Sequence, residues 1–148
     1  MKHFAFSLLI LTLVSLTSGA FAQQVFTTDG TAIRGYDPVA YFTDQKPVKG
    51  DSKFAFTQDS VTWLFANQQH LDTFRADPAK YTPQYGGYCA YGTSEGHKAP
   101  TQPDAWTVVN DKLYLNYNTK VKTEWDKNRD ERIEKANKEW AVIKDSKP

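Results

Sequence analysis

Three side chains in this sequence have the types needed for metal or thiol chemistry: Cys89, His70 and His97. Cys89 is the one cysteine, in the segment Tyr85-Gly86-Gly87-Tyr88-Cys89-Ala90-Tyr91. A lone cysteine cannot close an intramolecular disulfide, so it is either a small buried apolar residue or a free thiol with chemistry of its own. A reactive or metal-binding thiolate needs a cation, a helix N-terminus or a metal beside it, and tyrosines supply no positive charge. Both interpretations of Cys89 stay open.

The two histidines are candidate partners for this thiol. His70 falls near the edge of the apolar face of a predicted helix, where it is either solvated or a ligand, and His97 lies in a polar loop where an exposed side chain is the simpler expectation. Cys89 with either imidazole would give a partial metal site, or a thiolate–imidazole couple for redox chemistry. If one ion binds both groups, the sulfur should lie about 4–5 Å from that imidazole.

Residues 1–22 have the pattern of a secretory signal peptide. Lys2 precedes an apolar stretch from Phe4 to Leu16, and Ala20-Phe21-Ala22 is a small-x-small cleavage motif. The apolar stretch is too short to span a bilayer. We therefore expect cleavage between Ala22 and Gln23 and a periplasmic or secreted protein that is not embedded in a membrane.

The remaining chain, 23–148, has the length of a single domain. Without Lys2 it carries 17 basic and 17 acidic side chains. Nucleic acids and anionic membranes bind proteins through excess cations, so this balance argues against a nucleic-acid partner. No hydrolase, kinase or cytochrome motif is present, which favours a binding module over an enzyme.

The pattern of apolar residues predicts two β-hairpins and two helices. Alternation and turn residues indicate a short strand at 39–42, a hairpin over 53–65 and a second hairpin over 106–117. Asn67 is placed to cap a helix that ends near Ala76, and Asp37 to brace the Gly-Tyr-Asp-Pro turn. The proline- and glycine-rich stretch 81–103 should be irregular.

A final helix is expected from residue 118 or 119 to Ile143. Its apolar stripe should be largely buried against the domain, with the charged side chains between facing water. The stripe consists of Val121, Trp125, Ala136, Trp140 and Ile143.

Several stretches resemble the YHS-domain proteins, specifically the exported subfamily labelled YHS domain-containing (seleno)protein. They span about residues 32–117, and their combination is specific where any single piece is not. The stretches are Ala32–Phe42, Trp63–Ala66, Phe74–Tyr81, Pro83–Tyr91, Ala105–Val109 and Leu113–Tyr117. The resemblance implies a small α+β domain related to treble-clef-like, metal-binding modules. The apolar pattern adds the two hairpins, the short helix and the long C-terminal helix.

The sequence departs from the thiol motifs of metal-binding YHS domains. Those relatives carry Asp-Pro-Val-Cys and Phe-Cys-Ser-x-x-Cys, whereas here Ala40 follows Asp37-Pro38-Val39, and the last cysteine position of the second motif is His70. The resemblance therefore places His70 at a ligand position but weakens multi-thiolate coordination. The subfamily label implies that some relatives use selenocysteine, and hence that the position of Cys89 serves thiol or selenol chemistry.

The first hypothesis is an accessory module that binds a transition metal, most simply copper and otherwise zinc, or a small ligand, through Cys89, His70 and His97. On this hypothesis, one copper ion binds per chain and is lost in Cys89→Ser. The second is a thiol-redox protein in which Cys89 is the catalytic residue and an external thiol resolves the intermediate. The third is an interaction domain that uses its aromatic surface to bind a protein partner.

Overall fold

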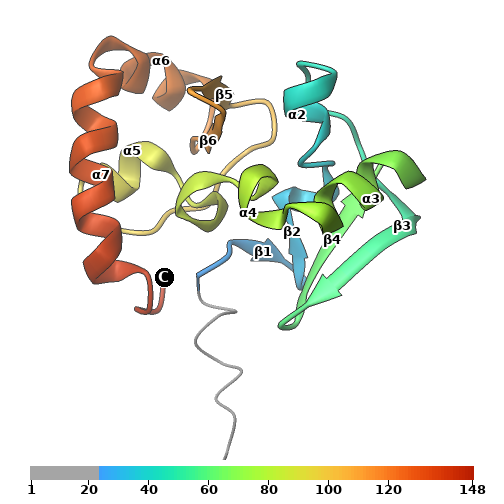
Figure 1. The fold of residues 1–148 in the computed structure, drawn as a ribbon. Helices are drawn as coiled ribbons and strands as arrows, with labels where there is room; N and C mark the ends of the chain where they lie inside the picture. Colours follow the sequence, from blue (N-terminus) through green and yellow to red (C-terminus); the bar gives the residue numbers. More distant parts are fainter. Residues whose placement is uncertain (1–23) are drawn as a thin grey trace, which may run out of the picture.

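The computed structural model describes residues 24–148 and has an α+β fold, as the sequence predicts (Figure 1). The predicted signal peptide and its cleavage site lie outside the described residues. A four-stranded sheet with α3 and α4 makes one side of the molecule, and α5, α6 and α7 make the other. The strands and helices are β1 (Thr27–Thr28), β2 (Thr31–Ala32), η1 (Ile33–Gly35), α2 (Ala40–Thr43), β3 (Asp51–Gln58), β4 (Val61–Phe65), α3 (Gln68–Ala76), α4 (Pro78–Tyr81), η2 (Gln84–Gly87), α5 (Ala90–Ser94), β5 (Trp106–Val109), β6 (Lys112–Leu115), α6 (Thr119–Lys127) and α7 (Arg129–Ile143).

The first predicted hairpin is confirmed as β3 and β4, which pair antiparallel in a sheet of order β1-β2-β4-β3. Asp59 and Ser60 turn the chain with φ of 51° and 66°, the left-handed geometry that matches the twist of a two-residue hairpin. Val61, Trp63 and Phe65 alternate inward from β4. They join a sheet cluster of buried residues that also contains Val25, Ala32, Ile33, Val39, Tyr41, Leu71, Phe74, Leu113 and Leu115.

Helix α3 also forms where the sequence predicts it. The side chain of Asn67 caps it by accepting a hydrogen bond from the His70 backbone N–H at 2.8 Å. Leu71 and Phe74 face the sheet cluster, and Phe74 packs on Trp63 with ring centroids 5.1 Å apart. The cap and this apolar face together place His70 at the end of α3 nearest to α2.

The predicted strand at 39–42 is wrong: these residues enter helix α2. The side chain of Asp37 accepts the backbone N–H groups of Val39 and Ala40 at 2.8 and 3.2 Å. Such contacts satisfy N–H groups at a helix start, so the Asp-Pro turn begins a helix here and not a strand. The apolar run Val39-Ala40-Tyr41 is buried on this short helix.

The stretch 81–103 is less irregular than its composition suggests, because η2 and α5 lie within it. Tyr85, Gly86 and Gly87 have φ of 57°, 61° and 86°, and this left-handed turn directs the chain into α5. At Gly86 a β-carbon would lie 1.6 Å from the carbonyl oxygen of Gln24. Only glycine fits there, because the N-terminal segment crosses so closely.

The second hairpin is confirmed as β5 and β6, but the single C-terminal helix is wrong. The chain breaks at Asn128 (φ −135°, ψ 42°), between α6 and α7. Trp125 is buried as predicted, whereas Val121, Trp140 and Ile143 are only half-buried. These helices complete a helix cluster in which Tyr85, Ala90, Tyr114, Trp125 and Ala136 are buried.

Candidate functional site

Asp37 is the centre of a buried hydrogen-bond network that includes His70, one of the predicted metal ligands. Its side chain has no solvent exposure. Besides the two N–H groups of α2, it accepts the Ala66 backbone N–H at 2.8 Å and faces His70 Nδ1 at 2.6 Å, both through Oδ2. Four donors compensate the desolvation of one carboxylate. Asp37 thus braces its own turn, as predicted, and also joins α2, β4 and α3.

The imidazole of His70 is held in one orientation by this contact. Its side chain is 10% exposed, and Nδ1–H donates to Asp37. The other ring nitrogen, Nε2, points to the end of α2, where it lies 3.3 Å from Thr43 Oγ1 and 3.8 Å from Asp44 Oδ1. A carboxylate that fixes the ring through one nitrogen leaves the second nitrogen for a ligand or a proton.

Asp44 brings a carboxylate, a group of metal-ligating type, to within 3.8 Å of Nε2. Its side chain is 38% exposed, so an ion can reach it from solvent. Two ligands about 2.1 Å from a tetrahedral ion are about 3.4 Å apart, close to the observed 3.8 Å between Nε2 and Oδ1. We call Asp37, Thr43, Asp44 and His70 the Asp37–His70 site. Its donors, an imidazole and a carboxylate, fit Cu²⁺ or Zn²⁺, and they do not fit the soft thiolate coordination of Cu⁺.

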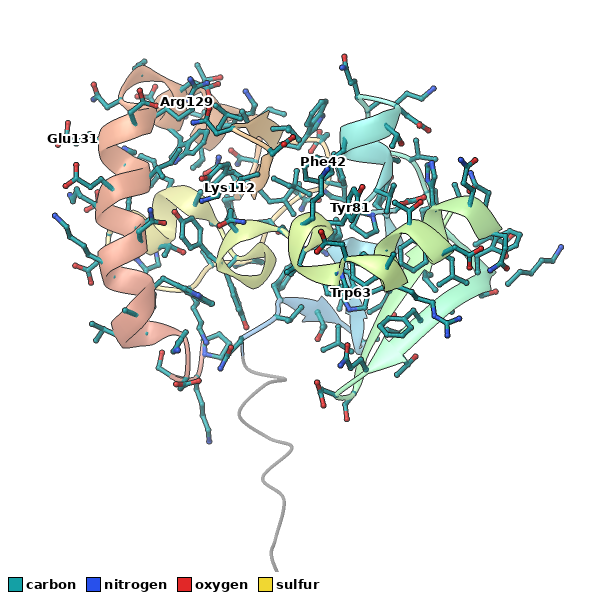
Figure 2. All side chains as sticks on the ribbon, viewed as in Figure 1. Phe42, Trp63, Tyr81, Lys112, Arg129 and Glu131 are labelled. Atoms are coloured by element: carbon teal, nitrogen blue, oxygen red, sulfur yellow. The ribbon has the colours of Figure 1, made fainter. Side chains whose placement is uncertain are left out.

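A T-shaped aromatic contact supports the wall of this site. Phe42 of α2 packs edge-on against Tyr81 of α4, with ring centroids 5.3 Å apart and an interplanar angle of 86°, and Figure 2 labels the two residues close together. Together with the buried Tyr41, whose hydroxyl donates to the Pro103 carbonyl at 2.9 Å, this contact fixes α2. The positions of Thr43 and Asp44 relative to His70 are therefore set by packed aromatic groups.

Cys89, unlike His70, lies in surroundings that give it a structural role. It is 1% exposed and immediately precedes α5. Its sulfur accepts the Gly92 N–H at 3.4 Å and the Tyr117 N–H at 3.2 Å, and the thiol donates to Asn116 Oδ1 at 3.5 Å. The sulfur thus replaces the oxygen of an ordinary N-cap and connects α5 to the residues after β6.

Burial raises the pKa of the Cys89 thiol, and the three backbone N–H groups of Gly92, Tyr117 and Tyr91 only partly oppose this effect. The neutral thiol is therefore the favoured form, which is the opposite of what a nucleophilic cysteine requires. The hydrogen bonds of the sulfur within residues 24–148 involve neither His70 nor His97.

His97 lies at the other end of α5. Its backbone N–H donates to the Gly92 carbonyl at 3.1 Å, and its ring Nε2 would be 3.2 Å from a β-carbon at Gly92. The side chain is otherwise exposed, which is the simpler of the two interpretations that the sequence left open for His97. In the described part of the chain, no three His, Cys, Asp or Glu side chains are grouped to hold a metal. Cys89, His70 and His97 thus do not form one three-ligand centre.

Sequence reasoning missed Thr43, Asp44 and Asn116. The first two were hidden by the mistaken strand at 39–42, since a helix is needed to bring them to His70. Asn116 carried no signal, because its contact with the thiol depends on how the second hairpin packs against α5. Asp37 was predicted only to brace a turn. Its match to the acid of the Asp-Pro-Val-Cys motif in metal-binding YHS domains could have indicated a role at the site as well.

Comparison with known proteins gives no relative for this chain. It matches no known family model, no curated protein and no solved structure. Within residues 24–148, none of the helices combines the length and the apolar character required to cross a lipid bilayer. The function must therefore be argued from the site itself.

Proposed function

We propose that this chain is an exported accessory module of the YHS type that binds one divalent transition-metal ion, Cu²⁺ or Zn²⁺. The ligands are His70 Nε2 and the Asp44 carboxylate, with water or a partner molecule filling the other positions. The observation that supports this proposal is the buried hydrogen bond from His70 Nδ1 to Asp37, which leaves Nε2 facing a half-exposed acid. Carboxylate–imidazole pairs of this kind commonly orient metal-ligating histidines.

Two protein ligands define an open site rather than a closed structural one. Such a site holds an ion reversibly, which suits delivery, sensing or presentation of the metal more than stabilisation of the fold. Because Nε2 must be unprotonated to bind, metal binding competes with a proton on the ring. Thr43 Oγ1 lies 2.8 Å from Asp44 Oδ1, and this contact holds the carboxylate beside Nε2.

The thiol-redox alternative has less support. A redox centre at Cys89 would need an accessible, stabilised thiolate, whereas the thiol is 1% exposed and burial raises its pKa. In this proposal His70 and Asp44, and not Cys89, carry the metal chemistry, and no nucleophilic role is assigned to the thiol. Cys89 retains the role of a helix cap.

Equilibrium dialysis of the protein against Cu²⁺ and Zn²⁺ tests the proposal. His70→Asn keeps an amide that can donate to Asp37 but removes Nε2, and it should abolish stoichiometric binding. Asp44→Asn should weaken binding at least tenfold without affecting the fold. Asp72→Asn, an exposed acid on the same helix as His70, is the matched control and should bind as the wild type does. Wild-type affinity in His70→Asn would overturn the proposal.

A further inference from the structure

A cleft of about 400 Å³ lies between the sheet cluster and the helix cluster, away from the Asp37–His70 site. Trp63 and Phe74 of the first cluster and Tyr85 and Trp140 of the second line it. Pro78 and Ala79 of α4 form part of its wall. Figure 2 shows Trp63 beside α4, on the side of that helix away from Phe42.

The lining of this cleft is uncharged. About a quarter of the residues in the sequence are charged, yet none of the described residues that line the cleft is Asp, Glu, Lys or Arg. Its polar side chains are neutral, and they include the amides of Gln24, Gln58 and Gln84 and the hydroxyl of Thr82. Bringing a charged molecule into such surroundings costs desolvation energy that no side chain of the lining would repay with an opposite charge.

The size of the cleft favours a small molecule over a protein. Pockets for small ligands typically occupy about 300–1,000 Å³, which includes this one, whereas a stable protein interface buries about 800 Å² on each partner. Aromatic rings prefer offset or edge-to-face contacts with other rings. The four aromatic side chains can therefore make more favourable contacts with a flat ring system than with an alkyl chain.

We propose that this cleft binds a neutral, flat, mostly apolar small molecule of about two rings. The aromatic walls contact its faces and edges, and the amides of Gln58 and Gln84 are available to a carbonyl or hydroxyl group on its rim. This second site is separate from the metal site, and either can exist without the other.

A matched pair of fluorescent probes tests the proposal. N-phenyl-1-naphthylamine is neutral, and 8-anilinonaphthalene-1-sulfonate has the same ring skeleton with one negative charge. The neutral probe should bind one molecule per chain with saturable emission, and at least tenfold more tightly than the anionic probe. Equal affinity for the two probes, or no saturable binding of either, would overturn the proposal.

Substitutions at Ala79 locate the binding. This residue is exposed on α4 and lines the cleft, so Ala79→Asp adds a charge there without disturbing the clusters. We expect Ala79→Asp to weaken binding of the neutral probe at least tenfold. Ala79→Trp should weaken it as much, because the indole would fill the cleft. Ala76→Asp adds the same charge at an exposed alanine outside the cleft and should have no effect. Equal effects of the charge at 79 and 76 would overturn the proposal, and so would a dimer that Ala79→Asp dissociates, since the occupant would then be a second copy of this chain.

Discussion

His70 and Cys89 are both nearly buried, with 8% and 1% of the whole residue exposed, yet their hydrogen-bonding groups are arranged in opposite ways. All of the hydrogen-bonding capacity of the Cys89 thiol is engaged by Asn116, Gly92 and Tyr117. His70 uses Nδ1 on a buried carboxylate and keeps Nε2 facing the half-exposed Asp44. Burial alone therefore does not identify a functional side chain. What distinguishes the two regions is whether bonding capacity remains on the side that solvent can reach.

The largest expected effect is the loss of the anchor beneath His70. Asp37→Ala leaves three backbone N–H groups and the imidazole of His70 without their acceptor, which should lower the free energy of unfolding by about 3–5 kcal/mol. Urea denaturation measures this change. Asp44→Asn removes an exposed acid from the same site and should stay within about 0.5 kcal/mol of the wild type. Similar stability of both variants would mean that Asp37 is not an anchor, and the contrast between the two regions would fail.

The turn that precedes Cys89 should be the next most sensitive point. Gly86→Ala places a β-carbon 1.6 Å from the carbonyl oxygen of Gln24 at a φ of +61°, so the N-terminal segment must move. We expect a loss of about 2–4 kcal/mol. Gly96→Ala shares the left-handed φ, at +82°, but would meet only the flexible side chain of Glu139, and should cost about 1–2 kcal/mol. Thermal denaturation of the two variants separates the steric clash at residue 86 from the backbone strain that both share. Equal losses of stability would contradict the close crossing of the N-terminal segment at Gly86.

The Cys89 sulfur, which caps α5, should contribute less to stability than the turn before it. Cys89→Ala leaves the N–H groups of Gly92 and Tyr117 without an acceptor and should cost about 1–2 kcal/mol. Cys89→Ser restores an acceptor and should recover part of that loss. Both variants should bind Cu²⁺ as the wild type does. A stable Cys89→Ala variant that fails to bind copper would mean that Cys89 is a metal ligand.

The pH dependence gives the smallest effect. Because burial raises the pKa of Cys89, the folded thiol stays protonated where the unfolded thiol ionises, above about pH 8.5. The unfolded state then binds fewer protons, so stability falls as the pH rises through this range, by at most about 1.4 kcal/mol per pH unit. Buried tyrosines act in the same direction, so the relevant quantity is the difference between the wild type and Cys89→Ser in urea unfolding at pH 7 and pH 10. A difference that is the same at both pH values would contradict a raised thiol pKa.

Much of the fold could be predicted because its signals are local. The alternation of Val61, Trp63 and Phe65 and the cap at Asn67 act within a few residues, and both elements formed as expected. The helix at Ala40 was missed because its residues are ones that favour strands. It forms because Asp37 accepts the N–H groups at its start, a contact that the residue types of 39–42 do not reveal. The break at Asn128 was missed because no proline or glycine marks it.

The candidate site was only half predictable. His70 was identified through a resembling motif, but its partners come from α2, which was assigned to the wrong secondary structure. Cys89 was singled out as unusual, yet its role depends on Asn116 and Tyr117, which reach it only through tertiary packing. Chemistry-bearing residues can be found from their types, whereas the number of free bonding positions on each is known only from the fold.

Electron paramagnetic resonance of the protein loaded with one equivalent of Cu²⁺ distinguishes a metal site at His70 from one at Cys89, because it reports the atoms bound to the metal. We expect coupling to a single imidazole nitrogen with no thiolate ligand, unchanged in Cys89→Ser and His97→Asn and lost in His70→Asn. A thiolate-type spectrum that disappears in Cys89→Ser and persists in His70→Asn would mean that Cys89, and not His70, binds the metal.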